Sequence, residues 1–187
     1  MKVLAILAAA SLALAVPTPE NASPIPPDEL IWPWETYRYW VKSGKTDLDP
    51  PSGLVQKNGN PDQEITTLVN FQFPPETAGK TCKLLFDLWP RDTSTGSQRA
   101  DVFTSLAPEG FSTASDGVWP PGNKRDVHVG RIHVTAPGSA VWEQSYHGFP
   151  EFPCPAGRLL GGEFVGVGDR DKIEYDLGVT GPRIQVL

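Results

Sequence analysis

The sequence is poor in the residues from which metal sites and nucleophilic sites are built. Its 187 residues include two cysteines and three histidines, His128, His133 and His147. A zinc site needs three or four converging nitrogen, sulfur or carboxylate ligands. His128 and His133 fall five positions apart in one expected strand, where alternation puts them on opposite faces unless a bulge at Gly130 changes the phase. There is also no G-x-S-x-G elbow of a serine hydrolase. We therefore expect no catalytic residue, no metal and no cofactor.

Dense basic patches and long apolar runs are also missing beyond residue 15. The formal charge of the whole chain is −6. A nucleic-acid-binding surface needs clustered lysines and arginines, and a membrane-spanning helix needs about 20 consecutive apolar residues. The composition therefore predicts neither a nucleic-acid partner nor a membrane span.

The first fifteen residues have the pattern of a secretory signal peptide. Met1-Lys2 is a short basic start, residues 3–15 are almost entirely apolar, and Ala13-Leu14-Ala15 is a small-x-small cleavage motif. We expect cleavage after Ala15, with Val16-Pro17 as the alternative position; a buried N-terminal helix is the competing interpretation. Cleavage leaves 172 residues, enough for one domain, with a formal charge of −7 because Lys2 is lost. The predicted location is extracellular or associated with a cell wall.

Two cysteines in a secreted chain are expected to pair. A Cys82–Cys154 bridge closes a long loop; the alternative is two free buried thiols. Asn21 begins the only N-x-S/T glycosylation sequon, and Pro24 directly behind the sequon weakens it as an acceptor.

The rest of the chain favours β-strands. Residues 16–31 are rich in proline and are expected to form a flexible lead-in to a single domain over 32–187. In residues 80–89, Cys82, Leu84 and Phe86 alternate with Lys83 and Asp87, so Cys82 faces the core. Other strands are expected at residues 53–57, 65–73, 100–106, 126–136, 139–146, 159–167, 172–177 and 183–186. This pattern predicts an all-β, antiparallel β-sandwich of jelly-roll-like type, with a disulfide that can tie its two sheets together.

Short motifs around both cysteines carry a resemblance. They are Gly79-Lys80-Thr81-Cys82, Phe152-Pro153-Cys154-Pro155-Ala156-Gly157, Val69-Asn70-Phe71 with Phe73-Pro74, and the closing strand. Together they resemble the fungal secreted But-two-type C-terminal domain family (ubiquitin-like activating enzyme binding protein, C-terminal domain-like) over residues 37–187. The resemblance implies a β-sandwich with one inter-sheet disulfide and no established enzymatic activity. It supplies no catalytic residues.

The aromatic residues suggest the leading functional hypothesis. Trp32, Trp34 and Trp119 are flanked by prolines in loops, where exposed rings can stack on sugars. We expect a non-catalytic protein that binds cell-wall polysaccharide; the alternative is an effector-type or other protein-interaction module. A third hypothesis is a weak glycoside hydrolase, which needs two carboxylates roughly 5–9 Å apart. Its candidate pairs, all expected in turns or on outward strand faces, are Asp169 with Asp171, Glu174 with Asp176, and Asp47 with Asp49.

Overall fold

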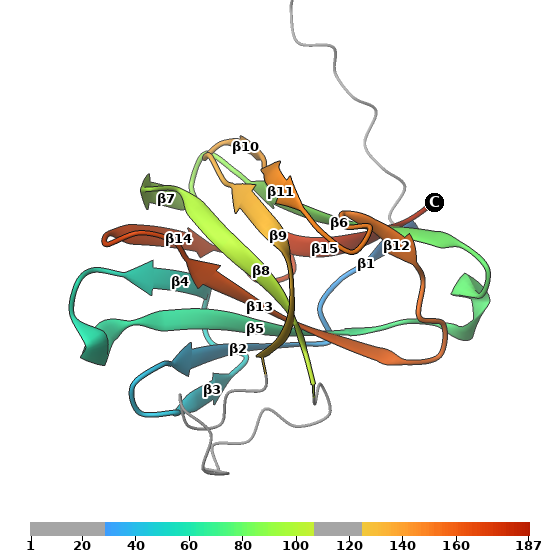
Figure 1. The fold of residues 1–187 in the computed structure, drawn as a ribbon, viewed down its shortest axis with the longest axis horizontal. Coiled ribbons are helices and arrows are strands. Elements are labelled where there is room, and N and C mark those ends of the chain that lie inside the picture. The colour runs from blue at the N-terminus through green and yellow to red at the C-terminus, as the bar shows by residue number, and fades with distance from the viewer. Residues whose placement is uncertain (1–28, 107–124) are drawn as a thin grey trace, which may run out of the picture.

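The computed structural model describes residues 29–106 and 125–187, and these residues form an antiparallel β-sandwich (Figure 1). Two short 3₁₀ turns lie between strands of this part of the chain, η2 (Pro61–Gln63) and η3 (Pro75–Thr77). None of the described residues forms a helix long and apolar enough to cross a membrane. The prediction of an all-β sandwich with one disulfide is confirmed.

The smaller sheet has five strands in the order β1-β15-β6-β10, with β12 also pairing with β6. The strands are β1 (Leu30–Ile31), β6 (Thr81–Leu88), β10 (Gly138–Ser139), β12 (Glu151–Pro153) and β15 (Gly181–Val186). All of its pairings are antiparallel, and β6 is its centre because β15 lies along one edge of β6 while β10 and β12 share the other.

The larger sheet has ten strands, which fan across the molecule in Figure 1. Its main path runs β11-β9-β8-β13-β5-β4-β14-β7, and β2 pairs with both β5 and β3. The strands are β2 (Glu35–Trp40), β3 (Thr46–Leu48), β4 (Gly53–Lys57), β5 (Ile65–Gln72), β7 (Thr93–Gly96), β8 (Arg99–Ser105), β9 (Arg125–His133), β11 (Val141–Ser145), β13 (Leu159–Gly166) and β14 (Asp171–Tyr175).

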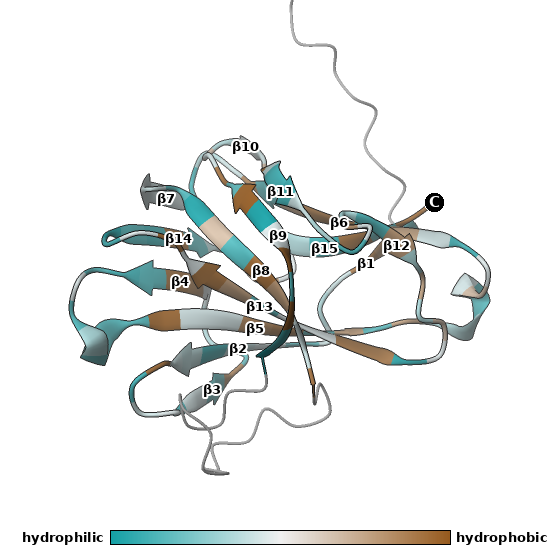
Figure 2. Cartoon of the chain, viewed as in Figure 1, coloured by the Kyte–Doolittle hydropathy of each residue, from teal (hydrophilic) through white to brown (hydrophobic). Residues whose placement is uncertain are grey.

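The hydrophobic core lies between the two sheets. Alternate residues of β6 are buried, so that Leu84 and Phe86 face the core while Lys83 and Asp87 do not. Phe86 meets Phe164 and Tyr175 of the larger sheet edge to face, both at 5.3 Å between ring centroids. Figure 2 shows the same alternation of hydrophilic and hydrophobic residues along β8 and β9. The period-two pattern therefore decides which side of each strand enters the core.

Two features differ from the sequence-based expectation at the N-terminal side. The lead-in was expected to extend to residue 31, whereas Leu30 and Ile31 form β1 and pair with Gln185 and Ile184 of β15. The alternating pattern of residues 65–73 predicts a half-buried strand, whereas every residue of β5 except Gln72 is buried. The outer face of β5 is buried because Leu68 packs in a second cluster with side chains of β2.

The bulge expected at Gly130 is confirmed. Val102 of β8 faces Gly130, but the next residue, Phe103, faces His128, so one residue of β9 is skipped. A side chain at Gly130 would clash, because a Cβ there would lie 2.3 Å from the Gln144 carbonyl oxygen. The bulge puts His128 and His133 on the same face of the sheet, in line with Phe103 and Arg99, which simple alternation does not predict.

The disulfide joins the predicted cysteines but does not join the two sheets. Cys82 belongs to β6, and Cys154 directly follows β12, which pairs with β6 in the same sheet. The Cys154 amide donates a hydrogen bond to the Lys80 carbonyl, continuing that pairing. The expected inter-sheet bridge is therefore wrong, because β12 returns to the edge of the smaller sheet before its cysteine is reached.

Candidate functional site

The short strand β1 places Trp32 on the outer face of the smaller sheet. Ile31 packs against the core, so alternation turns its neighbours Leu30 and Trp32 away from it. The guanidinium of Arg183, on the adjacent strand β15, lies 5.4 Å from the centre of the Trp32 ring. The Trp32 side chain is thus half-buried and held against the sheet from one side.

One hollow lies between Trp32 and Trp34, and we call it the Trp32–Trp34 hollow. Its volume is about 530 Å³. It is lined by Trp32, Pro33, Trp34, Gln72, Phe73, Pro74, Pro75 and Gly157, none of which carries a charge. The Trp34 side chain is 68% exposed, so its ring is free to contact a ligand.

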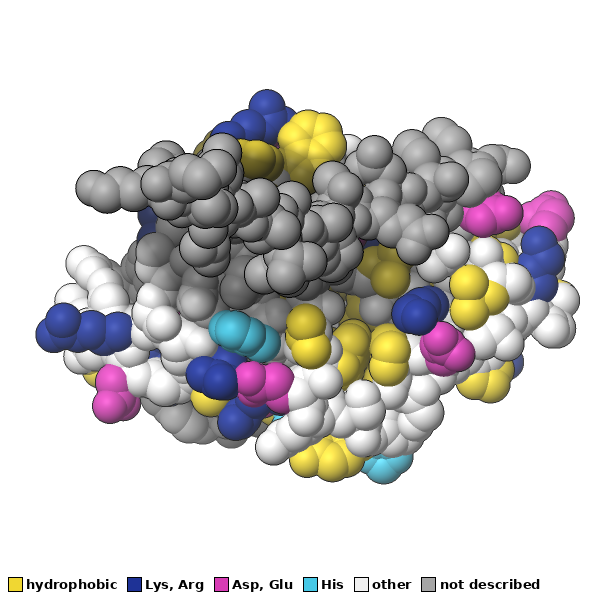
Figure 3. Space-filling model, turned by 90° about the horizontal axis from the view of Figure 1, so that it is seen from above, with side chains coloured by type: hydrophobic (Ala, Val, Ile, Leu, Met, Phe, Trp, Pro, Cys, Tyr) yellow, Lys and Arg dark blue, Asp and Glu magenta, His cyan; other side chains and the backbone are white. Residues whose placement is uncertain are grey.

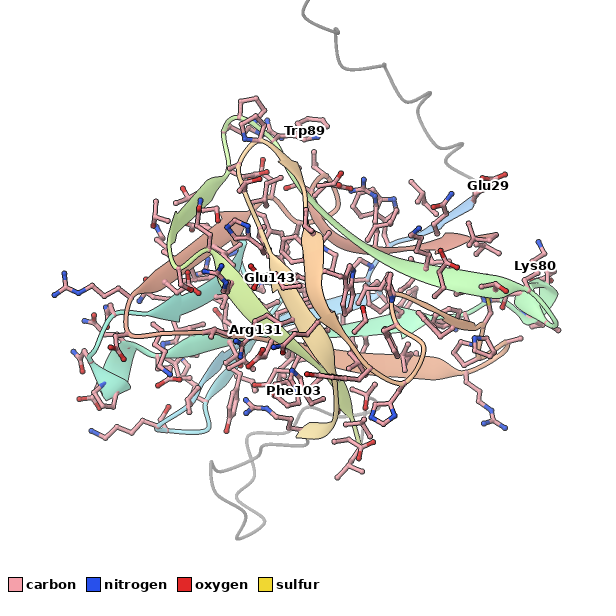
Figure 4. The ribbon with its side chains drawn as sticks, turned by 45° about the horizontal axis from the view of Figure 1, so that its top comes forward. Glu29, Lys80, Trp89, Phe103, Arg131 and Glu143 are labelled. Carbon is pink, nitrogen blue, oxygen red and sulfur yellow. A yellow bond between two sulfur atoms is a disulfide. The ribbon has the colours of Figure 1, made fainter. Side chains whose placement is uncertain are left out.

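A second hollow, the Trp32–Trp89 hollow, is also lined by Trp32. Its volume is about 560 Å³, and its lining includes Trp32, Leu85, Asp87, Trp89, Ser139 and Arg183. Trp89 follows β6, is 50% exposed, and lies at the edge of the molecule in Figure 4. Both hollows fall within the 300–1,000 Å³ that is usual for ligand sites.

The polar part of the second hollow is the pair formed by Asp87 and Arg183. Arg183 Nη2 donates a hydrogen bond to Asp87 Oδ2, and the two side chains are 14% and 17% exposed for Asp87 and Arg183 respectively. Arg183 Nε is buried and makes no hydrogen bond within the described residues. The hollow therefore combines two aromatic rings with a charged pair that has both donor and acceptor groups.

The structure describes two of the three predicted tryptophans. Trp32 and Trp34 come together in one hollow, whereas Trp119, like the sequon residue Asn21, lies outside the described residues. Trp89 lines the second hollow and is not among the predicted residues. Its signal was the same one, because Trp89-Pro90 repeats the Trp-Pro pair of Trp32-Pro33.

The paired carboxylates are mostly engaged in the fold. Asp171 is 4% exposed and accepts hydrogen bonds from Ser97 Oγ and the Gln98 amide, so its expected position on the surface is wrong. Burial raises the pKa of Asp171, although its hydrogen bonds act in the opposite direction. Its partner Asp169 is exposed.

The other two pairs are on the surface, as predicted. Glu174 contacts Lys172 and Asp176 contacts Arg91, each at 2.7 Å between nitrogen and oxygen. Asp47 and Asp49 are both exposed around the end of β3.

The outer face of the larger sheet carries ion pairs. Arg131 contacts Asp101 and Arg99 contacts Glu143, at 2.7 and 2.8 Å between nitrogen and oxygen. Arg131, Glu143 and Phe103 lie near one another on these strands in Figure 4. The face in Figure 3 likewise shows basic side chains beside acidic ones. Among the described residues, no group of three His, Cys, Asp or Glu side chains could hold a metal ion.

No family model matches the chain, and no curated protein matches it. The resemblance to the But-two-type family therefore stays a prediction.

Proposed function

We propose that the protein is a non-catalytic glycan-binding module. The observation that supports this best is the position of Trp32, which lines two hollows and is flanked by the exposed rings of Trp34 and Trp89. Tryptophan rings have large apolar faces that pack against the carbon-bound hydrogens of a sugar ring. Carboxylate and guanidinium groups form hydrogen bonds with the hydroxyls of the sugar. Both kinds of group are present in the Trp32–Trp89 hollow.

We further propose that the protein acts outside the cell, at a fungal cell wall or in the surrounding medium. The apolar stretch at residues 3–15 supports export. The Cys82–Cys154 disulfide is compatible with an extracellular location, because such bonds persist in oxidising compartments. The resemblance to a fungal secreted family points the same way.

A protein-interaction module is the second candidate. The Trp32–Trp34 hollow favours it, because a groove lined by aromatic rings and prolines also suits an extended proline-rich peptide. A weak glycoside hydrolase is the third. It requires two carboxylates that converge on bound sugar, and it predicts the release of reducing sugar.

The test is retention of the purified protein on insoluble chitin, β-glucan and cellulose. Two variants remove the proposed contacts: the single variant Trp32→Ala and the double variant Trp34→Ala, Trp89→Ala. Tyr146→Ala is the matched control, because Tyr146 is 42% exposed but follows β11 in the other sheet. We expect the parent and the control to be retained on the polymer and the tryptophan variants to remain unbound. Absence of parent retention on all three polymers overturns the glycan proposal, and sugar release from a retained polymer favours the hydrolase.

A further inference from the structure

We infer that the ligand is an uncharged, extended oligosaccharide that crosses Trp32 and occupies both hollows at once. This inference rests on the proposed glycan-binding function and adds the length and the charge class of the glycan. It follows from the way the two hollows share Trp32 and from the pairing of Arg183, the one cation that lines them among the described residues.

The length of the glycan follows from the residue that the two hollows share, Trp32. Trp32 lines both hollows, whereas Trp34 lines only the first and Trp89 lines only the second. A single sugar ring can contact only one of the hollows, whereas a chain that passes over Trp32 contacts all three rings. Each hollow is large enough for a ligand by itself, so contact in the second hollow adds to the affinity obtained in the first.

The absence of charge on the proposed glycan follows from the cationic side chains near the hollows and their partners. Arg183 donates a hydrogen bond to Asp87. The guanidinium of Arg91 is 5.3 Å from the Trp89 ring centre and contacts Asp176. Among the described residues that line the two hollows, Arg183 is the only cationic side chain. An anionic sugar needs a cation that is available to its carboxylate, and breaking a largely buried pair such as Asp87–Arg183 to supply one is costly. The Trp32–Trp34 hollow has no charged lining residue at all.

The two hollows differ in what they offer. Asp87 uses only its Oδ2 in the bond to Arg183, so its other oxygen is available to accept a bond from a sugar hydroxyl. The Trp32–Trp34 hollow offers polar as well as carbon surface, but none of its lining side chains is charged. The Trp32–Trp89 hollow is therefore the primary position, which binds short sugars, and the Trp32–Trp34 hollow binds only the extension of a longer chain.

The experiment is a calorimetric titration with di- and hexasaccharides of β-1,3-glucan, cellulose and chitin, with hexagalacturonate as the anionic comparison. Trp34→Ala should weaken binding of the hexasaccharide by about two- to tenfold, the usual range for one aromatic contact, and leave the disaccharide unchanged. Trp89→Ala should weaken both lengths. The neutral hexasaccharide should bind about tenfold or more tightly than hexagalacturonate.

Asp87→Asn provides the complementary test, because it removes the carboxylate that pairs with the Arg183 guanidinium. Its affinity for hexagalacturonate should rise while its affinity for the neutral hexasaccharide falls, and thermal melting checks that the variant is folded. Equal affinity for the two lengths, equal loss from Trp34→Ala at both lengths, or preferred binding of hexagalacturonate by the parent overturns this inference and leaves glycan binding itself supported. No binding of any of these sugars, together with no retention on the polymers, overturns the proposed function as well.

Discussion

Asp171 and Glu174 are three residues apart in β14 and have opposite environments. Asp171 is buried, and its carboxylate holds the backbone that enters β8 through the Gln98 amide. Glu174 is about one-third exposed, and its carboxylate accepts a 2.8 Å hydrogen bond from Ser52 Oγ while it contacts Lys172. The contacts with Lys172 and Ser52, and the charge of Arg38, lower the pKa of Glu174. Both carboxylates are therefore hydrogen-bonded within the fold, which counts against the hydrolase hypothesis at these positions.

Glu174→Gln should lower the free energy of unfolding by about 0.2–1 kcal/mol at pH 7, the range for a partly exposed ion pair. A carboxyl whose pKa is lowered in the folded state stabilises the fold above its unfolded pKa, ordinarily 4.5. That contribution is lost as the pH falls through the lower, folded pKa, so the difference between parent and variant should shrink below pH 4.5. Urea titrations across this range measure it. Glu76→Gln, at an exposed position in η3, is the control, and a difference that stays constant with pH contradicts the assignment.

The individual strands were predictable to the extent that one face is buried and the other is wet. Strand β4 begins and ends where the pattern places it, at Gly53 and Lys57, and β6 differs from its predicted range by one residue at each end. The exceptions all depend on a neighbour distant in sequence. Leu68 on the outer face of β5 is buried against side chains of β2, which pairs alongside, and β1 pairs with the edge of β15.

The candidate site was predictable by residue type and less so by partner. Proline-flanked tryptophans suggested Trp32 and Trp34, and the same rule applied to Trp89 would have found it. The Asp87–Arg183 pair could not be foreseen, because the two residues are 96 positions apart and meet only through the pairing of β6 with β15. A sequence shows which side chains suit a ligand, but the strand pairing decides which of them share a hollow.

Removal of residues 1–32 should cost about 2 kcal/mol of stability relative to removal of residues 1–28. The longer truncation deletes β1, takes Ile31 from its packing against the core and exposes an edge of β15. It also deletes Trp32, so retention on polysaccharide should disappear with it. Urea unfolding of the two truncated proteins measures the difference. Equal stability of both would show that β1 adds nothing to the domain.

At the scale of the whole molecule, the disulfide acts through the length of chain that it closes. Cys82 and Cys154 are 72 positions apart, and the segment between them leaves the smaller sheet, forms β7, β8, β9 and β11 of the larger sheet, and returns through β12. The bridge itself lies within the smaller sheet. The closed loop nevertheless contains strands of both sheets. The bridge therefore lowers the conformational entropy of the unfolded chain over segments that belong to both sheets in the folded state.

The Cys82→Ala, Cys154→Ala double variant should therefore lose stability globally and not only around β12. Loop-closure entropy for a loop of this length is worth about 4 kcal/mol, a large share of the 5–15 kcal/mol typical of a folded domain. Equilibrium urea unfolding should show the loss, and native-state hydrogen exchange should show faster exchange in β8 and β13 as well as in β6 and β12. The single Cys82→Ala variant tests whether a free Cys154 thiol adds any further change. If faster exchange were confined to β12 and its pairing with β6, the bridge would be a local clamp on one sheet edge, and the global effect derived from the loop would be wrong.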